Sequence, residues 1–385
     1  MMVMGEMQFR DRMPSEPFRS DDVKSHECPE SAKEGKCMRL NTPWTSLDAE
    51  SHAIMVSMYR AALGTLFLSS VAFPDLYQPL LTPLWQWLIR NPLYRLSTFE
   101  TIWTVLLYAV IEVSMTIVFM RNPQWRFAVQ QDTKEGDAAR KPHGMRRPSR
   151  RWGEAVTYMT PLLLMDLTMI KKFADVPLTA MLESGNYHAA AAAIAANNTT
   201  TAYHHTFLVP TLHNMTMSSP LQTQRALPDL PPTSRRIALE LATSFFLYDA
   251  LFFLFHYSLH VIPVAKRWHA PHHRHAEIHP QITNQLHILE RLGLVLLANF
   301  SLNIIKSHVF TRTLFVPIFV WLLVELHSGL DLPWGYDKIL PKGWGGGARK
   351  HSLHHARGGG GYEPYFTWWD NLLEQAGQSP KEHVE

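Results

Sequence analysis

Histidine spacing is the feature of this sequence that could carry chemistry. Between Asp249 and Asn371 the chain holds an H-x3-H pattern, two H-x2-H-H patterns and, between these two, His327 at the start of a His-Ser-Gly segment. Two copies of H-x2-H-H are not expected from composition alone, so we interpret them as metal ligands of a catalytic centre. The nine candidates are His256, His260, His269, His272, His273, His327, His351, His354 and His355.

The number of imidazoles indicates more than one metal ion. Residues three or four apart on a helix share a face, so each pattern is expected to direct its imidazoles to one point. A single tetrahedral zinc takes four ligands, whereas two ions with open positions can use nine. Neutral imidazole suits iron, copper and zinc, so the ligand type leaves the metal open. A histidine-rich surface is the alternative, and it is the preferred interpretation for the isolated His188, His204, His205 and His213.

Several segments around these histidines follow a family pattern. Asp249 stands seven residues before His256, and His287-Ile-Leu-Glu290 follows the first H-x2-H-H. His327-Ser-Gly-Leu-Asp-Leu-Pro-Trp334 and Tyr365-Phe-Thr-Trp-Trp-Asp-Asn-Leu372 complete the set. Over residues 237–374 the chain resembles the fatty acid hydroxylase / sterol desaturase superfamily of membrane non-haem di-iron oxygenases, and the last two segments are most similar to its sterol hydroxylases and methylsterol oxidases. Ile288 replaces a usual proline, and Gly358 to Gly361 replaces a more structured segment, which leaves the local geometry there open.

The resemblance implies a di-iron site that uses O2 to convert a lipid C–H bond into an alcohol, or, by a second hydrogen removal, into an alkene. Zinc could replace iron in purified material. The electrons must come from outside, because no flavin or nicotinamide fingerprint appears, and the family implies a cytochrome b5-type donor. His287 and Asp331 are further candidate ligands. Ligand imidazoles need acceptors that fix their tautomers, and the candidate acids are Asp249, Glu290, Glu325, Asp331 and Asp370. A solvated or capping role is the alternative, above all for Glu325 and Asp370.

Composition indicates a membrane protein. Apolar residues make up 46% of the chain and charged residues 18%, and both are unevenly distributed. We therefore predict an all-α helical membrane bundle that carries a cytosolic helical domain with the histidines. Glu112 is expected to face the bundle interior, and Trp85, Trp87 and Tyr94 to lie at the membrane interface. The predicted spans are 58–81, 101–120, 237–255 and a hairpin of 292–305 with 310–326, and a shorter piece, 155–170, either spans or merely enters the membrane.

A basic loop over residues 121–152 predicts the orientation. Beside two apolar spans, its arginines and lysines favour a cytosolic loop over a nucleic-acid patch. If 155–170 spans the membrane, residues 173–236 are lumenal and all the histidine patterns lie on the cytosolic face. The family implies the endoplasmic reticulum as the location.

The chain is expected to have five parts. Residues 1–56 are polar and expected to be disordered, and their Cys28 and Cys37 imply no disulfide framework. Residues 57–182 form membrane helices with the basic loop, 183–236 a flexible low-complexity insertion with three N-x-[ST] sequons, 237–374 the catalytic domain and 375–385 a polar tail.

The function that fits best is O2-dependent hydroxylation of a lipid, with a sterol favoured by the His-Ser-Gly segment. Two alternatives remain. One is a desaturase or hydroxylase of fatty acyl or sphingolipid chains on the same fold. The other is a non-enzymatic zinc-binding membrane protein, which should place its ligands near the middle of the bilayer, whereas these histidines follow the apolar spans.

Overall fold

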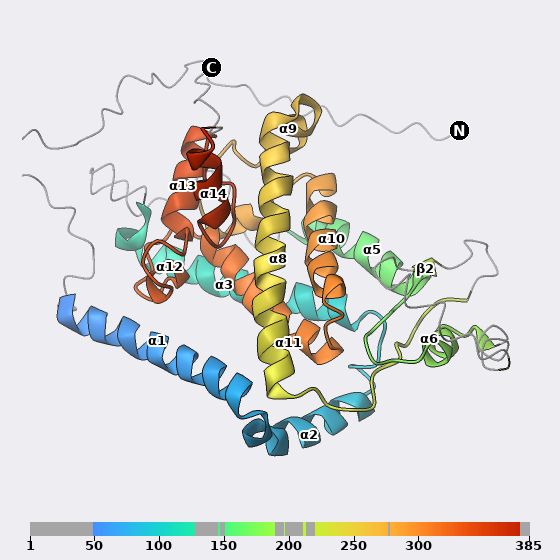
Figure 1. The fold of residues 1–385 in the computed structure, drawn as a ribbon. Helices are drawn as coiled ribbons and strands as arrows, with labels where there is room; N and C mark the ends of the chain where they lie inside the picture. The colour runs from blue at the N-terminus through green and yellow to red at the C-terminus, as the bar shows by residue number, and fades with distance from the viewer. Residues whose placement is uncertain are drawn as a thin grey trace, which may run out of the picture.

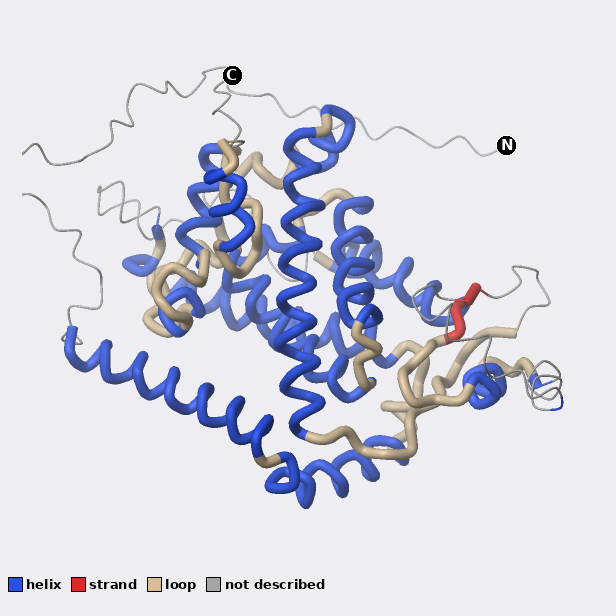
Figure 2. The backbone as a smooth tube through the Cα atoms, in the orientation of Figure 1, coloured by secondary structure: helices blue, strands red, loops and turns tan. Residues whose placement is uncertain are grey.

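The computed structural model describes residues 49–127, 145–146, 151–188, 196, 211–212, 220–275 and 278–377. Cys28 and Cys37, the three sequons, most of the basic loop and the end of the tail lie outside these residues. Regular structure in the described part is helical apart from two short strands, β1 (Met169–Ile170) and β2 (Thr211–Leu212), which pair antiparallel (Figure 2). The prediction of an all-α protein is confirmed.

Four helices within the described residues are long and apolar enough to cross a membrane. They are α1 (Ala49–Ala72), α3 (Phe99–Arg121), α8 (Ser234–Val261) and α11 (Val309–Leu326). A helix rises about 1.5 Å per residue, so 18 to 28 residues approach or exceed the roughly 30 Å of a bilayer core. These helices support an integral membrane protein. The shorter α5 (Trp152–Thr168), which contains Pro161, leaves the orientation argument a prediction.

The predicted span over 58–81 is wrong in its bounds. Helix α1 ends at Ala72, and α2 (Pro74–Arg90) begins two residues later. Proline lacks an N–H and disfavours helical backbone in the residue before it, so Phe73 separates the two helices. The predicted interfacial belt is also wrong for two of its three members. Trp85 and Tyr94 are buried in one apolar cluster, while Trp87 is exposed.

Helix α8 is the central element of the catalytic region (Figure 1). It begins at the cap residue Thr233, whose Oγ1 accepts a hydrogen bond from the N–H of Arg236, and it ends shortly before Pro263. Helix α10 (Ile288–Ile304) packs beside it and continues into α11 through residues 305–308, so the predicted pair of helices is present, but only α11 is among the four candidate spans. The remaining short helices are η2 (Pro123–Trp125), α6 (Leu178–Ser184), α9 (Pro263–His269), η5 (Pro280–Asn284), α12 (Tyr336–Ile339), α13 (Gly347–Arg357) and α14 (Trp368–Gln375).

An aromatic core holds the catalytic helices together. Tyr248 and Phe252 of α8 pack against Phe315 and Leu326 of α11 and against Tyr365, which precedes α14. Each buried aromatic side chain removes a large apolar area from contact with water or lipid headgroups. Because this cluster joins α8, α10, α11 and the segment before α14, it fixes how the helices that carry the histidines approach one another.

The expectation of a flexible insertion is wrong for residues 220–233. Gln222 and Arg225 are almost completely buried, and Leu96 forms an isolated β-bridge with Gln224. The backbone N–H of Gln222 donates to the carbonyl of Leu167, and Arg225 donates to the carbonyl of Tyr94. Composition suggested a loop, but these pairings satisfy the polar groups of the segment inside the fold.

Glu112 faces the bundle interior, as predicted. Its Oε2 lies 2.7 Å from Nη1 of Arg151, and the two side chains are 4% and 13% exposed. Arg151 also donates to Glu154 from the same turn. This pair joins α3 to the start of α5.

Removing one partner of this ion pair should be more damaging than removing both. Glu112→Leu leaves the Arg151 guanidinium without its closest buried carboxylate, and such changes cost about 3–5 kcal/mol of unfolding free energy. We expect a clearly lower thermal unfolding midpoint in detergent for Glu112→Leu, and partial recovery in Glu112→Leu/Arg151→Leu. A double variant less stable than both single variants would contradict this account.

Candidate metal centre

All nine predicted ligands gather in two adjoining groups at the end of α8 that carries His256 and His260. Within each group the potential ligand atoms lie within 4.8 Å of one another. The groups touch, since the rings of His273 and His355 stack with centroids 4.4 Å apart. The first group contains His256, His260, His269, His273 and His354, and the second contains His272, His327, His351 and His355.

The expectation that each pattern serves one point is wrong for both H-x2-H-H patterns. His269 and His273 join the first group, whereas His272 between them joins the second. His351 and His355 join the second group, whereas His354 joins the first. On α13, residues four apart are turned by about 40° from one another and adjacent residues by about 100°. After α9, the turn over residues 270–273 separates His272 from His269 and His273. Each H-x2-H-H therefore supplies ligands to both groups.

Five chain segments position the imidazoles. Helix α8 carries the first pair, and His269 ends α9, followed by a tight turn in which the N–H of His272 donates to the carbonyl of His269. His327 is the cap residue at the end of α11. The last pattern lies on α13, which ends at Gly358 with φ of 71°, a left-handed conformation that favours glycine.

The imidazole nitrogens that face away from the groups are held by acceptors. Nδ1 of His256 donates to the carbonyl of Tyr362 over 2.8 Å, and Nδ1 of His269 donates to Oε1 of Glu290 over 2.7 Å. Carbonyl and carboxylate oxygens only accept, so both Nδ1 atoms carry the proton and both Nε2 atoms carry a lone pair. Two further Nδ1 atoms are held in the same way, that of His327 by the carbonyl of Leu323 and that of His354 by the carbonyl of Gly360.

Two lone pairs therefore face each other in the first group. Nε2 of His256 lies 3.0 Å from Nε2 of His269, and in the neutral imidazoles that bind metals neither atom has a proton to share. Such an approach is repulsive unless a cation binds both nitrogens. Nε2 of His260 and Nε2 of His354 are buried and have no hydrogen-bond partner among the described residues. The geometry of this group is that of a metal site.

The separations between nitrogens also fit a metal centre. Five pairs of Nε2 atoms within the two groups are separated by 2.8 to 3.2 Å. Two nitrogens bound about 2.1 Å from one ion at right angles would be about 3.0 Å apart, and tetrahedral ligands would be further apart. The donor set, all imidazole with five and four members, fits two ions of a transition metal and not calcium or magnesium.

The acids predicted to orient the ligands act in different ways. Glu290 contacts a ligand directly, through His269. Asp249 instead accepts from the backbone N–H of Tyr365, and Asp370 accepts from that of Tyr362. These two carboxylates hold the loop whose carbonyl fixes His256. Glu325 accepts from the N–H of Tyr336 and from Trp321 and contacts no histidine of either group.

The two further candidate ligands lie outside both groups. Nδ1 of His287 caps α10 by accepting from the N–H of Leu289, and Asp331 forms an ion pair with Lys338 over 2.6 Å.

The backbone at the glycine of the His-Ser-Gly segment explains why a glycine stands there. Gly329 has φ of 68°, and a Cβ there would lie 2.2 Å from the carbonyl oxygen of Ile278.

Sequence reasoning missed three contributors to the site. The carbonyls of Tyr362 and Gly360 come from the glycine-rich loop, which carries no acidic or ligand side chain that could have drawn attention. Glu363 accepts from the N–H groups of Trp368, Trp369 and Asp370 and so caps α14. The only signal for Glu363 was its position two residues before the Tyr365–Leu372 segment.

The imidazoles outside the membrane helices are kept neutral. Burial, followed by the neighbouring imidazole of His269, lowers the pKa of His273 to about 3. Burial and adjacent histidines also hold the pKa values of His351, His354 and His355 well below the ordinary 6.5. A neutral imidazole is the form that binds a metal ion.

Metal-free protein should therefore lose stability in acid. Unfolded histidines take up protons near pH 6.5, while the folded His273 does so only near 3, so the unfolded state binds more protons throughout that window. We expect the unfolding midpoint of chelator-treated protein to be constant above about pH 7 and to fall steadily as the pH drops below 6.5. Thermal melts between pH 8 and pH 5 test this, and a midpoint that rises on acidification would contradict it.

The comparisons with known proteins point in the same direction. The fatty acid hydroxylase family model matches residues 241–375. Cholesterol 25-hydroxylase of Rattus norvegicus is 30% identical over 148 residues, which cover 38% of this chain and 50% of that protein. A cholesterol 25-hydroxylase-like protein of Danio rerio is 34% identical over 143 residues, covering 37% and 57% of the two chains.

A second kind of relative is the C-4 methylsterol oxidase of Candida albicans, 30% identical over 161 residues, which cover 40% of this chain and 51% of that protein. This chain thus spans about half the length of the relatives it matches. No solved structure matches it. The matched region contains all of the predicted ligands and the acids that orient them. The region that matches the fatty acid hydroxylase model is thus the region that carries both histidine groups.

Proposed function

We propose that this protein is a membrane-bound di-iron oxygenase that hydroxylates a C–H bond of a sterol with O2. The observation that carries the proposal is the pair of unprotonated Nε2 atoms of His256 and His269, which face each other at 3.0 Å inside a group of five imidazoles. A metal ion bound by both nitrogens makes that arrangement favourable. The names of the relatives, cholesterol 25-hydroxylase and C-4 methylsterol oxidase, support the substrate class.

The chemistry balances with one O2 and two electrons. The C–H bond becomes C–OH, and the second oxygen atom leaves as water after taking up two protons. Two iron ions would supply the O2 activation, which no side chain in the site can perform alone. The electrons come from an external donor protein of the cytochrome b5 type. The protein belongs to the endoplasmic reticulum in this proposal, with the histidines on the cytosolic side.

The chain's own residues perform the other tasks. His256, His260, His269, His273 and His354 would hold one iron, and His272, His327, His351 and His355 the other. Glu290 and the carbonyls of Tyr362, Gly360 and Leu323 keep four of these imidazoles in the tautomer that exposes Nε2. Burial of both groups, at 7% exposure or less for seven of the nine histidines, excludes bulk water from the reacting centre.

The arrangement argues against a zinc transporter. A transporter needs ligands within its membrane spans. Here most ligands lie beyond the ends of the membrane helices, on α9, α13 and the turn after α9.

Metal content and turnover measured on one detergent-purified sample test the proposal. We expect two irons per chain and an O2- and reductant-dependent hydroxylated sterol. Two metals with hydroxylated or desaturated acyl chains, and no sterol product, would favour the fatty acyl or sphingolipid alternative. One metal or none in a folded sample, with no turnover after iron is added, would overturn the proposal.

A further inference from the structure

A cavity separate from the histidine groups lies between α3, α5, α10 and α11. Most of its wall is apolar and comes from residues such as Leu162, Met165, Val295, Val316 and Phe319. Leu296, which also lines it, is 46% exposed, so the cavity opens at the surface of α10. An apolar cavity with few polar groups is the usual form of a site for a small apolar ligand.

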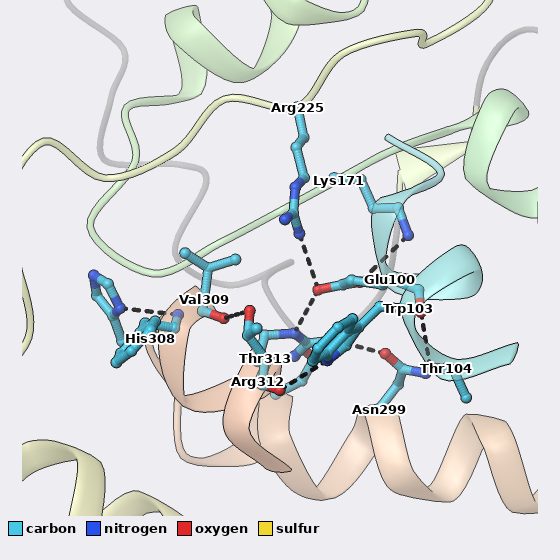
Figure 3. A network of polar contacts seen from close by, with 12 residues as sticks. Glu100, Trp103, Thr104, Lys171, Arg225, Asn299, His308, Val309, Arg312 and Thr313 are labelled. Carbon is cyan, nitrogen blue, oxygen red and sulfur yellow. Dashed lines mark hydrogen bonds and ion pairs between the residues drawn. The ribbon is translucent and has the colours of Figure 1, made fainter. Parts of the chain in front are cut away.

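One end of the cavity is polar and rigidly built (Figure 3). Arg225, Lys171 and Arg312 point toward Glu100, at distances of 3.3, 3.5 and 3.4 Å from its carboxylate oxygens. Three cations therefore surround one carboxylate, an arrangement that favours its charged form. Asp166 pairs with Lys171 on the opposite side. The network joins α3, α5 and α11 at one point.

The two cations of this network that line the cavity, Lys171 and Arg312, are already committed, which argues against an anionic ligand. Arg312 uses Nε for Glu100, Nη1 for Asn303 and Nη2 for Asn299. Lys171 contacts both acids, and Lys172, which also lines the cavity, has an interaction of its own. A phosphate or carboxylate would have to break these pairs.

A neutral hydroxyl fits the same end without breaking any pair. The side chain of Glu100 is 20% exposed, and its Oε2 has only the 3.5 Å contact with Lys171, so it can accept one more hydrogen bond. The amide nitrogen of Asn303 has no acceptor among the described residues and can donate one. Both residues are held on the same guanidinium, that of Arg312. A hydroxyl is both donor and acceptor, so it can use both groups.

The distance from this end to the histidines is set by two helices. Asn303 and Glu290 lie on α10, about 20 Å apart along its axis, and Arg312 lies about 22 Å along α11 from His327. That is close to the length of a sterol from its ring hydroxyl to the end of its side chain. Packed aromatic side chains of the core lie between the cavity and the site: Phe319 of the cavity wall contacts Tyr248, Tyr248 contacts Phe252, and Phe252 contacts His256.

We propose that this cavity binds the hydroxyl-bearing ring end of a sterol, so that the far end of the side chain reaches the histidine groups. The inference rests on the proposed function for its substrate class. It also decides between the two reactions named for the relatives. C-4 is adjacent to the ring hydroxyl and would lie at the wrong end, whereas C-25 lies at the end of the side chain.

Binding of tritiated cholesterol to the purified full chain tests the cavity directly. Val316→Phe fills the cavity, and Ile318→Phe, two residues away and 43% exposed, is the matched control. We expect about tenfold weaker binding for the first variant and none of that loss for the second, with metal content equal in both. Equal binding by Val316→Phe and the unchanged protein would overturn the proposal.

The hydroxyl contact is tested by competition with 5α-cholestane, which lacks the hydroxyl. Cholestane should compete about tenfold less well than cholesterol, and Asn303→Leu should reduce that preference. If cholestane and cholesterol compete equally well for the unchanged protein, the proposal is overturned. It is also overturned if phosphatidic acid displaces tritiated cholesterol better than either sterol compound does.

The position of oxidation separates this inference from the proposed function. A side-chain alcohol is expected. A product oxidised at C-4 would keep the sterol oxygenase and overturn the binding orientation, whereas cholesterol binding without any turnover by iron-loaded protein would count against the proposed function alone.

Discussion

Replacing His354 or His272 by alanine is expected to abolish turnover while the protein still inserts into the membrane. His354 belongs to the group of five imidazoles and His272 to the group of four, so each variant removes a ligand from a different ion in the proposed site. Loss of one ligand should lower turnover by a factor on the order of a thousand or more and reduce the metal content from two ions per chain to about one.

These two positions are the most informative because each belongs to a different group from the other two histidines of its own H-x2-H-H pattern. If each H-x2-H-H served its own ion, His354→Ala would affect the same ion as His351→Ala. In the observed arrangement His354→Ala should affect the ion that His256→Ala affects. Spectroscopy that distinguishes the two iron environments can tell these cases apart.

His287→Ala is the matched control for both variants. His287 lies in the same domain and was itself a candidate ligand, but it caps α10 and belongs to neither group. Loss of this cap should cost about 1 kcal/mol of unfolding free energy and leave two metals per chain. Unchanged product formation in His354→Ala or His272→Ala would refute the ligand assignment.

Glu290→Leu is expected to weaken metal binding by about 10- to 100-fold without removing a ligand. Glu290 is 3% exposed, and its Oε1 is the acceptor that keeps the proton of His269 on Nδ1. With an apolar side chain in that place, the imidazole loses its preferred orientation and its Nε2 is no longer held as a lone pair.

Glu290→Gln should be milder, because the amide oxygen can still accept from Nδ1 of His269. Glu325→Gln provides the control, since Glu325 is also buried and hydrogen-bonded but contacts no histidine of either group. That variant should change thermal stability and leave metal affinity unaltered. Titration of chelator-treated protein with iron measures all three, and equal affinities for Glu290→Leu and the unchanged chain would contradict the role of Glu290.

Much of the catalytic region follows from local sequence rules. Histidines at spacings of three and four, long apolar runs, and a buried acid in the segment after the first H-x2-H-H are visible without a structure. They predicted the helical fold, the pair of helices α10 and α11, the interior position of Glu112 and the nine histidines that gather in the two groups. The family resemblance added the metal and the substrate class to these expectations.

Tertiary structure decided how these parts meet. Periodicity states which side chains share a face of one helix, but not which faces of different helices meet. The sorting of His272 and His354 into opposite groups depends on the angles at which α9 and α13 approach α8. Backbone carbonyls such as those of Tyr362 and Gly360 exist at every residue, so their use as acceptors cannot be recognised from residue type. The burial of Arg225 could not be predicted for a similar reason. Its segment is polar and has the composition of a loop, and its ion pair with Glu100 of the distant helix α3 is visible only in the tertiary structure.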